Sequence, residues 1–129
     1  EIYDQPRSVF VAKFVGTPAM NMFAATASGG VAAMGSISVP VPASTPAQAI
    51  VGIRPEDILI DHASATRATV ERFEVPGAET YVFCRVAGVT EPVVLRTAAR
   101  NDVRIGDELG ITLDAQRLHV FDAASGRRV

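Results

Sequence analysis

The sequence predicts an all-β protein, built either as one barrel or as a pair of small barrels. Short segments of alternating apolar and polar residues recur, with turn signals every eight to twelve residues or so. Helices that alternate with strands are missing, which excludes a doubly wound parallel nucleotide-binding fold. The 129 residues are 48% hydrophobic, enough for one domain or two small ones with a buried core.

One short helix is expected over residues 6–15, "PRSVFVAKFV". Pro6 suits the first helical position, where its missing N–H leaves no bond unmade. Gly16 favours a stop, and Pro18 prevents continuation. Four apolar residues fall at helical spacing and form one stripe: Phe10, Val11, Phe14 and Val15.

After this helix the apolar residues recur at every second position, the spacing typical of β-strands. Residues 21–42 predict two strands around a turn at Ser28-Gly29-Gly30, and residues 40–48, rich in proline, predict an exposed loop. A bulge near Glu71-Arg72 would explain a shift in the phase of the apolar positions there. Further strands are expected at 49–53, 68–75, 80–87, 92–98, 108–114 and 117–122.

Local backbone physics accounts for most of the stretch "VGIRPEDILI", residues 51–60. Pro55 holds Arg54 in the extended region and suits the start of a helical turn. Glu56 and Asp57 place negative charge at the positive end of that turn. Arg54 remains unexplained; it could pair with Glu56 or with a neighbouring surface. The apolar residues that follow are expected to return to the core: Ile58 and Leu59.

Composition argues against two classes of function. The net charge is −2, a single lysine stands against eleven arginines, and no basic stripe or basic–aromatic pattern is present, so a nucleic-acid binder is not expected. No 18-residue apolar run occurs that would predict a membrane-spanning helix.

The sequence contains no recognisable catalytic or metal-binding motif. No P-loop surrounds Lys13, and neither His62 nor His119 has a partner at ligand spacing. Cys84 lies in an alternating strand, which favours a small buried hydrophobe over a reactive thiol. Three carboxylates near one turn fit a solvated face better than a paired-acid site: Glu71, Glu74 and Glu79.

Four segments together resemble the part that follows the ATPase fold in sugar-type ABC importer ATP-binding subunits, the maltose and glycerol-3-phosphate class. They are "FVAKFVGTPAMN" at 10–21, "VGIRPED" at 51–57, "VERFEVPGAET" at 70–80 and "GDELGITLDAQRLHVFDAASGRR" at 106–128. The family often has Leu where this chain has Pro76. Their order matches the family, and the resemblance covers essentially the whole chain.

This resemblance implies a transport-associated OB (TOBE) domain, an OB-like or MOP-like barrel that regulates the transporter. Residues 1–20 would be the connector helix from an ATPase domain located N-terminal to them in the same parent chain. Residues 21–129 would form the regulatory domain, as one OB-like unit or two intertwined small barrels. ATP and magnesium would belong to that ATPase domain, and this segment would hold no cofactor, metal or catalytic residue of its own.

The resemblance also implies a homodimer partner, transmembrane permease subunits bound through the parent, and a place on the cytoplasmic side of the inner membrane. The candidate interaction surface comprises the 54–57 corner, the 77–80 turn and the 117–122 strand with its Arg127-Arg128 tail. Within it, the candidate residues are Arg54, Glu56, Asp57, Gly77, Glu79, His119 and Arg127. Two alternatives stay open, a domain that binds small oxyanions such as molybdate and, less favoured, an OB-fold nucleic-acid binder.

Overall fold

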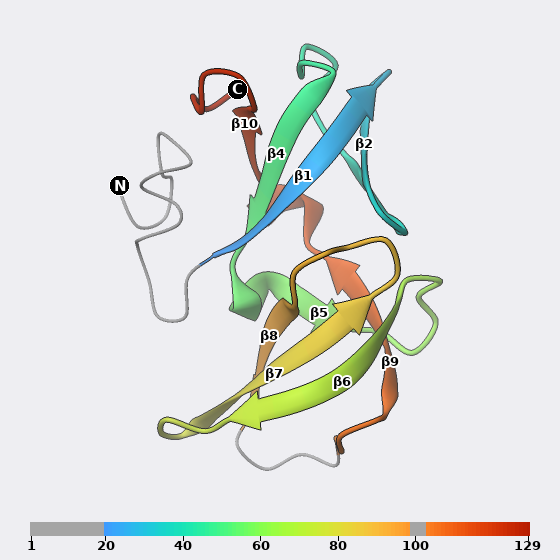
Figure 1. The fold of residues 1–129 in the computed structure, drawn as a ribbon, viewed down its shortest axis with the longest axis vertical. Helices are drawn as coiled ribbons and strands as arrows, with labels where there is room; N and C mark the ends of the chain where they lie inside the picture. The colour runs from blue at the N-terminus through green and yellow to red at the C-terminus, as the bar shows by residue number, and fades with distance from the viewer. Residues whose placement is uncertain (1–19, 99–102) are drawn as a thin grey trace.

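The computed structural model describes residues 20–98 and 103–129, and its strands form two antiparallel five-stranded sheets. Figure 1 shows one sheet above the other. This confirms the all-β prediction, whereas the helix expected over 6–15 lies outside the described residues. The first sheet has the order β10-β4-β1-β2-β3, with the strands β1 (Asn21–Ser28), β2 (Val31–Met34), β3 (Ile37–Pro40), β4 (Gln48–Ile53) and β10 (His119–Asp122).

The second sheet curls on itself, so that β8 approaches β5 and packs against the 3-10 turn η1 (Pro55–Asp57). Its order is β5-β9-β6-β7-β8. Its strands are β5 (Ile58–Ile60), β6 (Arg67–Glu74), β7 (Glu79–Val86), β8 (Val93–Ala98) and β9 (Glu108–Leu113).

The chain passes between the two sheets twice. It leaves the first sheet after β4 through η1, and it returns after β9 through the 3-10 turn η2 (Ala115–Arg117) to add β10 beside β4. A backbone hydrogen bond from the Asp114 N–H to the Asp57 carbonyl, 3.1 Å long, joins the two crossovers. The first sheet is therefore completed by a strand that follows the whole of the second sheet in sequence.

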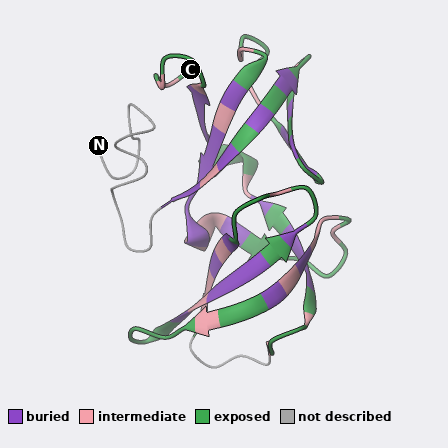
Figure 2. Ribbon diagram, in the orientation of Figure 1, coloured by how far each residue is buried: buried purple, intermediate pink, exposed green. Residues whose placement is uncertain are grey.

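Most of the buried apolar side chains form one core that runs through both sheets, and in some strands the inward-facing residues alternate with exposed ones. Figure 2 shows this alternation along β1. Phe23 and Val51 of the first sheet belong to the same buried cluster as Val82, Leu95 and Ile111 of the second. Each such fully buried side chain contributes roughly 1.5–3 kcal/mol of hydrophobic stabilisation.

The β2–β3 turn and the loop after β7 approach each other closely, backbone to backbone, between the sheets. A Cβ added to Gly35 would lie 2.5 Å from the carbonyl carbon of Gly88, and both glycines have positive φ, +57° and +78°. The Ser36 N–H donates to the Ala87 carbonyl over 2.9 Å beside this contact. Only glycine fits there, because any Cβ would collide with the opposite backbone.

Several details of the sequence prediction are confirmed and others need correction. The register shift between Val70 and Arg72 confirms the bulge, and Cys84 is fully buried. Residues 21–42 form three strands rather than two, since a second turn at Gly35-Ser36 divides the predicted second strand. Leu59 does not return to the core: it is 50% exposed on β5, a strand too short to be predicted.

The helical elements within the described ranges are the two three-residue turns η1 and η2. Neither has the length or the apolar character needed to cross a membrane.

Candidate functional site

The two crossovers meet at a polar depression of about 420 Å³. One wall is the corner at the end of β4, and the other is η2 with the start of β10; the C-terminal tail adds Arg128. This crossover depression brings together four of the seven candidate residues: Arg54, Glu56, Asp57 and His119. It also contains Gln116 and Arg117, which the sequence analysis did not single out.

Two of these residues are not surface residues in the expected sense. Arg54 and His119 are each only 6% exposed, although both line the depression. The 3-10 turn follows Arg54 directly, and the Asp57 N–H donates to the Arg54 carbonyl at 2.9 Å. Of the predicted 54–57 corner, Glu56 and Asp57 are partly exposed, whereas Arg54 is buried.

His119 is covered by the C-terminal tail. A guanidinium nitrogen of Arg128, Nη2, lies 2.8 Å from Nδ1 of the His119 ring. Since a guanidinium group can only donate, this contact is a hydrogen bond when Nδ1 of the ring is unprotonated and accepts. Burial lowers the pKa of Arg128, because desolvation disfavours its charged form.

The tail holds this position through backbone pairing along β10. The Asp122 N–H donates to the Arg127 carbonyl and the Val129 N–H donates to the Val120 carbonyl, each over 2.8 Å. An isolated bridge joins Phe121 to Arg128. The tail thereby covers the outer edge of β10, an edge that would otherwise offer its backbone groups to another strand.

The acidic side of the depression is electrostatically coupled to the basic side. Burial, followed by the neighbouring Glu56 carboxylate, raises the pKa of Asp57 above its ordinary value. The guanidinium groups of Arg117 and Arg54 act in the opposite direction on the same pKa. Charges of both signs therefore interact across the two walls.

The remaining candidates lie elsewhere. Gly77 is exposed in the β6–β7 turn, and Glu79 begins β7, where its carboxylate pairs with Nε of Arg96 at 3.0 Å. Arg127 is exposed beside Arg128 but does not line the depression. The other two carboxylates of the predicted acidic face also pair with arginines on the surface, Glu71 with Arg85 and Glu74 with Arg72.

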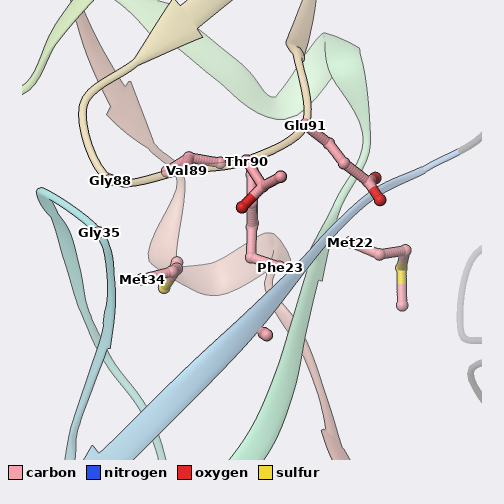
Figure 3. A pocket seen from close by; sticks show the side chains of 9 residues that line it. Met22, Phe23, Met34, Gly35, Gly88, Val89, Thr90 and Glu91 are labelled. Atoms are coloured by element: carbon pink, nitrogen blue, oxygen red, sulfur yellow. The ribbon is translucent and has the colours of Figure 1, made fainter.

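A second, less polar depression of about 310 Å³ lies between the sheets, at the Gly35–Gly88 contact. Figure 3 shows Gly35 and Gly88 side by side, with Val89, Thr90 and Glu91 continuing along the loop from Gly88, above Phe23. Within the described ranges, no group of three His, Cys, Asp or Glu side chains is placed to hold a metal ion.

Comparison with known proteins places this architecture in a family. A family model described as "TOBE domain" matches residues 51–121, more than half of the chain, and a model described as "CysA C-terminal regulatory domain" matches residues 21–60. The chain belongs to the TOBE domain family. The match to residues 51–121 contains both walls of the crossover depression and ends before the tail.

Curated relatives align with the entire chain. The sn-glycerol-3-phosphate import ATP-binding protein UgpC of Cereibacter sphaeroides is 40% identical over 100% of this chain and 37% of its own length. UgpC 3 of Agrobacterium fabrum is 40% identical over 100% of the chain and 38% of its length. UgpC of Cupriavidus pinatubonensis is 32% identical over 100% of this chain and 40% of its own length. The chain thus spans well under half the length of these relatives.

Proposed function

We propose that this chain is the C-terminal regulatory and dimerisation domain of the ATP-binding subunit of an ABC importer for sn-glycerol-3-phosphate or a related sugar-type solute. The observation that carries the proposal is the alignment of the entire chain with 37–40% of proteins named as import ATP-binding proteins. The match of residues 21–60, from β1 through the first crossover to β5, to a model described as a regulatory domain supports the regulatory part.

By this proposal the segment is not catalytic. ATP and magnesium bind to an ATPase domain of the same parent chain, and that domain couples hydrolysis to uptake through transmembrane permease subunits. The ATP-binding subunit, with this domain, lies on the cytoplasmic side of the inner membrane and is attached peripherally through the transporter complex.

Turnover of ATP by the 129-residue chain tests the non-catalytic role. Phosphate release should equal the background without protein, at any magnesium concentration. Nucleotide-dependent release above that background would contradict the proposal. Inorganic phosphate should be measured by a coupled colour assay, with a known ATPase as the positive control.

Sedimentation velocity tests the homodimer. The sedimentation coefficient of the chain should rise with protein concentration toward that of a dimer and should not change when ATP is added. A coefficient that stays at the monomer value up to the highest soluble concentration would remove dimerisation from the function of the isolated domain.

A further inference from the structure

The first sheet carries a second apolar cluster, separate from the core that runs through both sheets. Phe121 is fully buried in it and Met20 is 5% exposed, with Met22 and Ile50 packed against them. We propose that this outer cluster is the docking surface for residues 6–15 of the same chain, the segment that the sequence predicts to be a helix. The docking does not depend on the importer function proposed above, although its consequence for the importer does.

Strand register places the outer cluster on one face of the first sheet. Ile50 of β4 pairs with Phe121 of β10 on one side and with Ala24 of β1 on the other. Met22 lies two residues before Ala24 and therefore on the same face. Val51, next to Ile50, belongs instead to the core cluster on the opposite face. Apolar side chains from three adjacent strands thus form one continuous surface outside the core.

Gly52 makes room for two methionine side chains on this surface. A Cβ added to Gly52 would lie 2.7 Å from Sδ of Met20 and 3.0 Å from Sδ of Met22, so both side chains lie over the backbone of β4. Methionine is unbranched and polarisable, and it adapts its shape to an apolar partner. The surface is therefore suited to receive the irregular apolar side of another segment.

The β1 side of the outer cluster still has apolar surface to bury. At the β10 end, the guanidinium carbon of Arg128 lies 5.7 Å from the centroid of the Phe121 ring. Toward β1, Met22 and Ile50 are partly exposed and Ala24 is exposed. An amphipathic helix laid along β1 and β4 would remove this surface from water, which favours docking.

Residues 6–15 fit this surface in chemistry and in reach. Their apolar stripe, Phe10, Val11, Phe14 and Val15, needs a partner because a helix of about ten residues is marginal alone. Met20, the first residue that the structure describes, is itself a member of the outer cluster. The chain from Val15 to Met20 spans at most roughly 18 Å even when fully extended, so the stripe stays within reach of the cluster.

Docking would change what the segment does in the proposed importer subunit. There it joins this domain to the ATPase domain that precedes it in the parent chain. A docked segment acts as a rigid joint, which fixes the orientation of the first sheet relative to the ATPase domain, whereas an undocked one is only a tether.

Tryptophan fluorescence of the 129-residue chain tests the docking, because the sequence contains no tryptophan of its own. Phe14→Trp places an indole on the stripe, and Val9→Trp places the matched control on the opposite side of the expected helix. The emission of Phe14→Trp should lie at shorter wavelength, and acrylamide should quench it several-fold less than the emission of Val9→Trp. Equal quenching of the two variants overturns the proposal.

A charge in the outer cluster should release the segment. Met22→Asp, added to Phe14→Trp, should shift the emission to longer wavelength and raise its quenching to the level of Val9→Trp, since docking would bury an unpaired carboxylate. Val31→Asp is the control, because this residue is 47% exposed on β2, beside the other end of β1. Circular dichroism establishes that each variant is folded, and Ile50→Ser replaces Met22→Asp if the latter unfolds the chain. Emission that stays unchanged in the folded cluster variant overturns the proposal.

Cross-linking identifies the copy whose surface the segment covers. Val11→Cys and Ile50→Cys in one chain should be joined by a short bismaleimide, whereas Val9→Cys with Ile50→Cys should react several-fold less. The native Cys84 is fully buried and does not compete. Covalent dimers in place of cross-linked monomers would mean that the segment covers a second copy, which would overturn the proposal. None of these readouts involves ATP turnover or sedimentation, so their failure would leave the importer function standing.

Discussion

The side-chain amide of Asn21 pairs with the backbone of Val94 as a second strand would. Its Nδ2 donates to the Val94 carbonyl over 2.8 Å, and its Oδ1 accepts from the Val94 N–H over 2.8 Å. Nδ2 also lies 3.2 Å from the carbonyl of Ile53, the last residue of β4. One buried side chain of the first sheet thus satisfies backbone groups of β8 in the second sheet, 73 residues away in sequence.

Replacing Asn21 by Asp should destabilise the chain by about 2–4 kcal/mol at neutral pH, because both donated hydrogen bonds are lost and a carboxylate is buried. The loss of stability should be smaller in acid, where the carboxyl group of the variant is protonated and can donate one hydrogen bond again. Urea unfolding at several pH values measures this. Gln116→Glu, an exposed amide-to-acid change, is the control and should shift stability by less than about 0.5 kcal/mol. Equal losses in the two variants would contradict the bridging role of Asn21.

Gly35→Ala should cost markedly more stability than Gly29→Ala. The two glycines have nearly the same φ, +57° and +59°, but a Cβ on Gly29 meets nothing within 4 Å, while one on Gly35 collides with the Gly88 backbone. The Gly29 variant should lose about 1 kcal/mol from backbone strain, and the Gly35 variant at least about 1–3 kcal/mol more from the clash. Unfolding midpoints that agree for both variants would show that the sheets separate freely at this contact.

The buried thiol of Cys84 should make the fold sensitive to alkali. Burial, and secondly the Glu71 carboxylate, raises the pKa of Cys84 from 9.0 to about 11. Because the folded state retains the proton, this stability is fully present below pH 9 and is lost as pH rises through about 11. The loss amounts to at most about 2–3 kcal/mol. The difference in unfolding free energy between the parent and Cys84→Ala should narrow over this pH range; a constant difference would contradict a buried protonated thiol.

Asp57→Asn should slightly stabilise the chain at neutral pH. The pKa of Asp57 is raised in the folded state, so its ionisation costs stability as pH rises through that pKa, and the asparagine variant escapes this cost. The gain should stay below about 1 kcal/mol because the side chain is partly exposed, and it should vanish in acid. Unfolding curves at neutral and acidic pH measure it, with Asp122→Asn as a comparison. A variant less stable than the parent at neutral pH would mean that the Arg117 and Arg54 charges outweigh burial.

The strands were predictable where local alternation decides them, as in β9, where Leu109, Ile111 and Leu113 face the core. The β5 strand could not be predicted from the sequence. Its three residues are too few to show an alternation of apolar and polar residues, and it pairs with β9, which is distant in sequence. The division of residues 21–42 into three strands depends on the Gly35–Gly88 approach, another long-range contact.

At the candidate site, too, the features that depend on long-range contacts could not be predicted from the sequence. The motif match selected the residues on both walls of the depression, but it could not show that Arg54 and His119 are buried. Their burial follows from the return of the chain through η2 and from the tail over β10. Arg117 carried no local signal; the basic residue closing the turn before "LHVFD" becomes informative only once that turn is known to face the corner at Pro55.

The order of the strands along the chain affects how this protein is made. During translation β1 to β4 emerge first, yet β10, the neighbour of β4, is synthesised only after every strand of the second sheet. Until then β4 presents an unsatisfied edge to the solvent, and such an edge can template aggregation. A nascent chain arrested before residue 119 should therefore recruit chaperones more strongly than one released after the tail has emerged.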